Sequence, residues 1–149
     1  MKKLIYLFSI LVLFACNKEK RFSKRLMKKE KWEVVDVYVD GTKSEFFGIW
    51  SVSPNVDIYD SVPSAIWNWN NQDAVANWQF QDKGKSFVLQ YQQQCVECDG
   101  VDLDSLDYFT YNISGKYDVE KHGFNKMIFK SNSTNLYSGK EVIINLRKK

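Results

Sequence analysis

Residues 77–94 read NWQFQDKGKSFVLQYQQQ, and this stretch decides the fold class. On both sides of the glycine-bearing segment 82–85, large apolar residues alternate with polar ones, namely Trp78, Phe80, Phe87, Leu89 and Tyr91. Such alternation is typical of strands that have one apolar and one polar face. The stretch therefore predicts an antiparallel hairpin that packs its aromatic face against a core.

Further segments with strand character surround this hairpin. They are residues 32–39, 45–52, 107–114, 115–119, 125–131 and 141–147. Asp40-Gly41 follows the first segment and is a strong signal for a two-residue hairpin turn. Residues 60–77 lack clear alternation, so there we expect a short helix or a lid. Seven or eight short antiparallel strands predict an all-β fold, either a sandwich or a single up-and-down β-barrel of about eight strands.

The first 15 residues have the features of an export signal. Lys2 and Lys3 precede an apolar run from Leu4 to Ala15 that only Ser9 interrupts. The run is shorter than the roughly 20 residues that span a bilayer, but it suits the core of about 7–15 residues found in signal peptides. We therefore expect residues 1–15 to be a signal peptide and the mature chain to be exported.

The end of this run, Leu13-Phe14-Ala15-Cys16, resembles a bacterial lipobox, with Phe14 in a position that usually holds a small residue. The resemblance implies that the Cys16 thiol is acylated and that Cys16 becomes the new N-terminus. Each buried methylene contributes about 0.8 kcal/mol, so two or more acyl chains anchor a protein firmly in a membrane. Asn17, in place of aspartate, favours the outer membrane. The alternative is an ordinary secretory signal that happens to precede a cysteine.

Charge is distributed unevenly after Cys16. Residues 18–31 contain eight basic and two acidic residues, whereas residues 32–149 contain 11 basic and 16 acidic ones. A basic cluster beside an acyl anchor suits an anionic lipid surface, and a solvated tether is the alternative. Phe22 and Leu26 have the spacing of one face of a short helix within residues 22–29. Export argues against a nucleic-acid partner for these cations.

The chain accordingly divides into three parts. We expect a signal peptide in residues 1–15, an acylated Cys16 with a basic tether or short helix in residues 16–31, and one barrel domain in residues 32–149. The last part is long enough to bury roughly two thirds of its unfolded surface.

Three features resemble the small lipocalin-like lipoproteins of Gram-negative bacteria. They are an N-terminal turn ending at Leu26, Trp32 on the first strand, and the W-x-F-x-x-x-G hairpin that begins at Trp78. Glu30 stands where the lipocalin pattern Gly-x-Trp has its glycine. The resemblance implies a closed barrel, and it places Trp32 across the closed end beneath the N-terminal turn.

The sequence offers little for catalysis or metal binding. His122 is the only histidine, and in the segment EKHGF we expect it to be exposed in a turn. A catalytic triad needs a histidine beside a nucleophile, and a zinc site needs three or four ligands. Acidic residues cluster between Glu97 and Asp107, where a solvated loop is expected and a calcium site is the alternative. We therefore expect no enzyme, no metal site and no cofactor.

Cys95 and Cys98 are the two cysteines that remain if Cys16 is acylated. Outside the cytoplasm, paired thiols tend to oxidise, so we expect a disulfide that closes a very short loop. Thiol exchange, a soft metal clip and free thiols are the alternatives.

Binding is the function class that remains. Residues 66–78 combine Trp67, Trp69 and Trp78 with amide side chains, which suits a small hydrophobic or amphipathic ligand, although these indoles could equally serve the core. A carrier would have an internal cavity lined by residues such as Trp50, Trp67, Trp69, Phe80, Phe87, Leu89, Tyr91, Tyr111 and Phe129. The alternative is a non-enzymatic structural or interaction subunit of an envelope assembly, with a filled barrel and a partner surface around residues 60–77.

Overall fold

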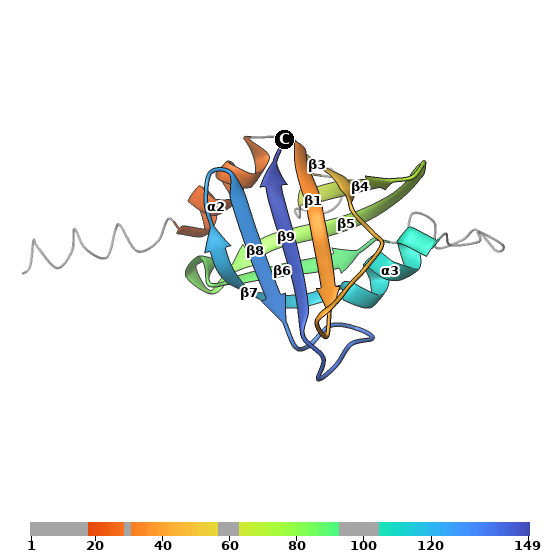
Figure 1. Ribbon diagram of the computed structural model, residues 1–149. Coiled ribbons are helices and arrows are strands. Elements are labelled where there is room, and N and C mark those ends of the chain that lie inside the picture. Colours follow the sequence, from red (N-terminus) through yellow and green to blue (C-terminus); the bar gives the residue numbers. More distant parts are fainter. Residues whose placement is uncertain (1–17, 29–30, 57–62, 93–104) are drawn as a thin grey trace, which may run out of the picture.

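The structure is a computed structural model that describes residues 18–28, 31–56, 63–92 and 105–149. In these ranges one antiparallel sheet of nine strands closes on itself (Figure 1). The strands are β1 (Lys31–Val39), β2 (Thr42–Lys43), β3 (Gly48–Val56), β4 (Pro63–Trp69), β5 (Gln72–Gln81), β6 (Ser86–Tyr91), β7 (Gly115–His122), β8 (Lys126–Ser131) and β9 (Val142–Lys148). Because β1 pairs with both β3 and β9, eight strands form a closed barrel and β2 is an extra strand beside β1.

This barrel confirms the predicted fold class, and the hairpin that predicted it joins β5 to β6. Trp78 lies opposite Leu89 and Phe80 lies opposite Phe87. The four side chains are buried, whereas Gln79 between them is exposed. The connection is a short 3₁₀ turn, η1 (Asp82–Gly84).

Two tight turns use left-handed backbone conformations. Asp40 and Gly41 have φ angles of 50° and 77°, and they join β1 to β2 as the sequence predicts. Asn70 and Asn71 have φ angles of 47° and 64° and join β4 to β5. Asparagine tolerates this conformation better than most residues with a side chain, which explains why a turn forms here without glycine.

The prediction of a helix or lid in residues 60–77 is wrong for the part that the structure describes, residues 63–77. There the chain forms β4 and most of β5. On β4, Ala65 and Trp67 are buried in the core, while Ile66 between them is 40% exposed. The alternation is hidden in the sequence because an isoleucine faces outward and small alanines face inward.

The prediction of a strand in residues 107–114 is also wrong, because this segment belongs to the helix α3 (Ser105–Ile113). Aromatic and β-branched residues gave it the composition of a strand. The buried side chains instead repeat at helical spacing, as Leu106, Phe109, Thr110 and Ile113 show. Tertiary packing over the core therefore outweighs local strand propensity.

The two helices lie at opposite ends of the barrel (Figure 1). Helix α2 (Lys18–Met27) confirms the predicted N-terminal helix, and Leu26 on it is fully buried. Trp32 packs beneath it, as the lipocalin resemblance implies, and its indole Nε1 donates a hydrogen bond to the Leu26 carbonyl at 2.9 Å. We call these two ends of the barrel the α2 end and the α3 end. No helix in the described part of the chain has the length and apolar character needed to cross a membrane.

Candidate functional site

The first group of predicted ligand-binding residues lies inside the barrel, where its rings pack against one another. The Phe87 ring stacks on Phe129 with centroids 4.1 Å apart, and it lies 5.2 Å from Phe80 and 6.2 Å from Trp50. The four side chains are at most 5% exposed. These aromatic rings therefore fill this part of the interior.

Trp67 and Leu89 continue the core toward the α3 end. Together with Trp50 they border an internal cavity of about 10 Å³, whose other walls are Val34, Ile113 and Ile144. A cavity of this size is close to that of one water molecule. It cannot hold an organic ligand unless the surrounding side chains move. The Trp67 indole instead donates a hydrogen bond to the Phe47 carbonyl at 3.0 Å.

Trp69 occupies the rim of the α3 end and is half-buried. Its indole meets the Phe46 ring edge-on at 4.7 Å, and Phe46 stacks on Phe109 of α3 at 4.3 Å. The Phe109 ring also lies 6.0 Å from Trp67. This chain of rings closes the α3 end around the helix.

The last two predicted residues, Tyr91 and Tyr111, meet outside the barrel. Their ring centroids are 6.4 Å apart and their planes are nearly perpendicular. They border an open pocket of about 360 Å³ between β6, the start of β7 and the C-terminal end of α3. The pocket is lined by Val88, Leu89, Gln90, Tyr91, Tyr111, Ser114, Gly115, Lys116 and Asn135.

Hydrogen bonds fix the floor of this pocket. The Ser114 hydroxyl donates to the Thr110 carbonyl at 2.7 Å and accepts the Tyr91 N–H at 2.8 Å, so it joins α3 to β6. The Asn135 amide donates to the Tyr111 carbonyl at 2.9 Å. Gly115 lies so close to the next segment that a Cβ there would be 2.6 Å from the Ser133 carbonyl oxygen. Only glycine permits this approach, so the pocket is built on a firmly held backbone.

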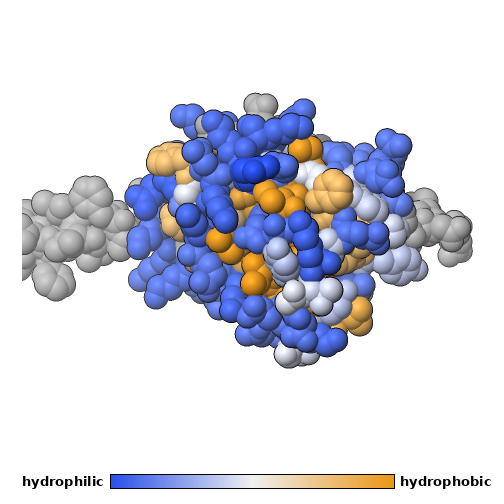
Figure 2. Space-filling view, viewed as in Figure 1, coloured by the Kyte–Doolittle hydropathy of each residue, from blue (hydrophilic) through white to orange (hydrophobic). Residues whose placement is uncertain are grey.

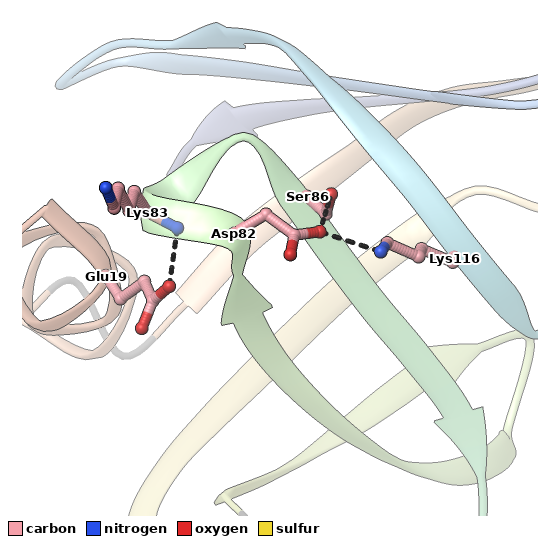
Figure 3. A network of polar contacts seen from close by, with 5 residues as sticks. All are labelled: Glu19, Asp82, Lys83, Ser86 and Lys116. Atoms are coloured by element: carbon pink, nitrogen blue, oxygen red, sulfur yellow. Dashed lines mark hydrogen bonds and ion pairs between the residues drawn. The ribbon is translucent and has the colours of Figure 1, made fainter.

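One charged group at the pocket belongs to a polar network that reaches α2 (Figure 3). The Lys116 ammonium pairs with Asp82 of η1 at 2.7 Å, and the Ser86 hydroxyl donates to the same carboxylate at 2.7 Å. The hydrogen bond from Lys116 and, to a smaller extent, the one from Ser86 lower the pKa of Asp82. On the other side of η1, Glu19 accepts the Lys83 N–H at 2.6 Å. The network ties the pocket wall to the turn that supports α2.

His122 does not lie exposed in a turn, so that prediction is wrong. It ends β7, where its ring stacks on Phe22 of α2 at 3.6 Å and Phe80 approaches edge-on at 5.3 Å. Arg25 donates to both the ring Nδ1 and the backbone carbonyl of His122, each at 3.0 Å. Burial, followed by the positive charge of Arg25, lowers the pKa of His122 to about 4. His122 therefore acts as a neutral contact between helix and barrel.

Several predicted residues lie outside the described part of the chain. These are Cys16, the pair Cys95 and Cys98, and the acidic residues from Glu97 to Asp104. Within the described ranges, no group of three or more His, Cys, Asp or Glu side chains is placed to hold a metal ion.

Sequence reasoning missed four polar residues of the pocket, Gln90, Ser114, Lys116 and Asn135. Ser114 and Lys116 fell in segments that were both read as strands, and Asn135 lies in the loop before β9. The helical spacing of buried residues in α3 is the signal that would have placed Ser114 at a helix end. Asn135 has no such signal, because its position depends on the contact between two loops.

No protein-family model matches this chain, and no curated protein sequence matches it either.

Proposed function

We propose that this chain is a lipid-anchored binding protein of the bacterial outer membrane, and that its barrel is a filled scaffold rather than a container. In this proposal, a small amphipathic ligand binds in the pocket between Tyr91 and Tyr111. The lipobox-like residues around Cys16 support the anchor. The chain then acts by binding, without catalysing a reaction.

The observation that carries this proposal is the contrast between the two cavities. The internal cavity of about 10 Å³ is far below ligand size, whereas the outer pocket of about 360 Å³ falls within the usual range of roughly 300–1,000 Å³. Two tyrosine rings at a right angle offer apolar faces, and the nearby Gln90 and Asn135 side chains carry amides. Rings combined with a few polar groups are typical of sites for molecules with an apolar face and hydroxyl or amide groups.

The test compares two exposed tyrosines on the same helix. Tyr111 borders the pocket and is 51% exposed, while Tyr108 is 57% exposed and does not line it. The full chain, extracted from membranes in detergent, is analysed by mass spectrometry of its organic extract as wild type, Tyr111→Ala and Tyr108→Ala. Losing a ring contact of about 1.4 kcal/mol weakens ligand binding about tenfold. We therefore expect one small molecule of the wild-type extract to be depleted in the Tyr111→Ala extract and to be retained in the Tyr108→Ala extract. A wild-type protein that carries no small molecule contradicts the proposal.

A second candidate is an interaction subunit of an envelope assembly, which the filled interior also supports. Ile66 on the outside of β4 is 40% exposed and lies opposite Val75 of β5, and Phe47 before β3 is 56% exposed. A photo-crosslinking residue at position 66 should give one discrete protein adduct in intact envelopes. The same photo-crosslinking residue in place of Tyr38, on the outside of β1, should give no protein adduct if β4 and β5 form the partner surface.

A further inference from the structure

Exposed cations from several distant segments gather at the α2 end of the barrel. Helix α2 presents Lys18, Lys20, Arg21 and Lys24, and Lys28 follows it. The neighbouring strand ends and turns add further exposed lysines: Lys31, Lys83, Lys85, Lys121, Lys126, Lys148 and Lys149. The positive charge is therefore a property of the folded end and not of the N-terminal segment alone.

Backbone contacts show how the fold brings these segments together. The Lys148 N–H donates to the Asn125 carbonyl at 2.9 Å, and Lys148 lies opposite Trp32 in the sheet. This places the end of β9 between the start of β1 and the β7–β8 turn. Gly84 of η1 lies directly beneath the Phe22 ring of α2. Figure 2 shows hydrophilic side chains over most of this side of the molecule.

Acidic side chains near this end leave most of the cations uncompensated. Glu19 accepts the Lys83 N–H, Asp82 pairs with Lys116, and Glu33 pairs with Arg147 at 2.7 Å. Asp118 and Glu120 are further exposed acids on β7, and Asp118 lies opposite Ser86. Among the described residues, five acids thus face twelve exposed cations, and three of the five acids already have partners.

An exposed aromatic residue lies within this cationic surface. Phe124 in the β7–β8 turn is 68% exposed, and the Arg25 guanidinium lies 4.1 Å from its ring centroid. Exposing such a ring to water is unfavourable, whereas phenylalanine flanked by cations is typical of surfaces that enter the headgroup layer of a membrane. The α3 end differs, because there the exposed acids Asp40, Glu45 and Asp73 accompany only two of the exposed lysines of the described residues, Lys43 and Lys140.

We infer that the α2 end docks face-on against an anionic lipid surface, with Phe124 inserted among the headgroups. Each cation near such a surface contributes about 1 kcal/mol, and the described residues of the α3 end have no comparable excess of cations, so the barrel takes one orientation. A lipid surface is favoured over a soluble polyanion because Phe124 supplies an apolar contact and because Cys16, the acylation site of the proposed function, lies two residues before α2 in the sequence. The inference is independent of the ligand pocket of the proposed function.

Lysine footprinting tests this orientation on the full chain. The chain is reconstituted in vesicles of phosphatidylcholine alone or with added phosphatidylglycerol, labelled with an amine-reactive reagent and analysed by mass spectrometry. With cation contributions of about 1 kcal/mol, labelling of Lys24, Lys83 and Lys121 should fall about threefold or more on anionic vesicles. Lys43 and Lys140 at the α3 end are the internal controls and should label equally on both.

Added salt and substitutions test whether the protection depends on the cations and on Phe124. The protection should shrink when ionic strength rises to about 1 M, where the screening length is about 3 Å. Lys24→Glu with Lys121→Glu should weaken the protection of Lys83, the reporter that remains, whereas Lys43→Glu with Lys140→Glu should leave the protection of Lys24, Lys83 and Lys121 intact. Phe124→Ser should weaken it, whereas Phe47→Ser at the α3 end should not.

Two outcomes would overturn the inference. Equal labelling of Lys24, Lys83 and Lys121 on neutral and anionic vesicles would show that the α2 end does not face the lipid. If a soluble polyanion such as heparin displaced the vesicle protection and itself protected these lysines independently of Phe124, the surface would belong to a polyanion.

Discussion

The indole of Trp32 donates a hydrogen bond to the Leu26 carbonyl at 2.9 Å, and both residues are fully buried. The last carbonyl groups of a helix have no partner within the helix. Trp32, on the first strand, supplies that partner for α2 and covers the end of the barrel at the same time. One side chain therefore ends the helix and attaches it to the sheet.

Replacing Trp32 with phenylalanine should destabilise the fold strongly. Trp32→Phe leaves the Leu26 carbonyl buried without its donor and creates a small void, so we expect the free energy of unfolding to fall by about 2–4 kcal/mol. Urea denaturation followed by circular dichroism measures this change. Trp69→Phe, at a half-buried rim position, is the control and should cost about 1 kcal/mol or less. Equal losses in the two variants would contradict this role of Trp32.

A methyl group at Gly84 should push α2 away from the barrel. Gly84 has a φ of +79°, and a Cβ there would lie 2.8 Å from a ring carbon of Phe22. Gly84→Ala therefore combines backbone strain with a steric clash, and we expect a loss of about 2–3 kcal/mol in unfolding free energy. Gly41→Ala and Gly139→Ala are matched controls, because their φ angles are +77° and +78° and a Cβ would meet nothing within 4 Å.

The difference between Gly84→Ala and these controls isolates the contact with Phe22. Hydrogen exchange of the α2 amides should accelerate in Gly84→Ala alone, because the clash acts on the helix. If the three alanine variants lost the same stability, backbone strain would account for the whole effect.

Strand alternation is a local signal, so the sequence was sufficient to predict an antiparallel all-β fold, and the resemblance to lipocalin-like lipoproteins favoured a barrel over a sandwich. The hairpin with Trp78 and Phe87, the Asp40-Gly41 turn and the helix ending at Leu26 each depend on residues close together in the chain. The strand predicted in residues 107–114 failed because Tyr108, Phe109 and Tyr111 favour strands locally. The burial of one helix face over the barrel end, including the packing of Phe109 against Phe46, makes the helix preferable.

The candidate site was harder to predict from the sequence than the fold. Nine ligand-binding residues were predicted, eight of them aromatic and the ninth Leu89, and the structure distributes them over a packed interior, the rim of the α3 end and an outer pocket. Core and pocket aromatics have the same alternation, so Phe87 and Tyr91 cannot be told apart by spacing. The pocket depends on Asn135 meeting Tyr111 across 24 positions, which is a tertiary contact.

Removing the Ser114 hydroxyl should loosen the pocket floor. Ser114→Ala deletes the donor to the Thr110 carbonyl and the acceptor of the Tyr91 N–H, and both groups lie in a buried or partly buried region. We expect a loss of about 1–3 kcal/mol in unfolding free energy. Hydrogen exchange at the Tyr91 amide should accelerate more than global unfolding alone would explain. Unchanged exchange at Tyr91 would contradict the assigned bond.

Stability should fall in mild acid because His122 is neutral in the folded chain. Its pKa is about 4 when folded and about 6.5 when exposed, so between these values the unfolded chain binds a proton that the folded chain does not. The free energy of unfolding therefore decreases as pH falls from about 6.5 to about 4. His122 is only half-buried, so solvent screening reduces the expected loss to about 1–2 kcal/mol.

His122→Asn separates this effect from the carboxylates that titrate in the same range. The asparagine oxygen can take the place of Nδ1 as acceptor for Arg25, but it does not titrate. Urea denaturation at pH 7.5, 6, 5 and 4 should show wild type losing about 1–2 kcal/mol more than the variant, because only the wild-type chain gains a proton when it unfolds. Parallel curves for the two proteins would mean that protonated His122 fits between Phe22 and Arg25, and the proposed neutral contact would be wrong.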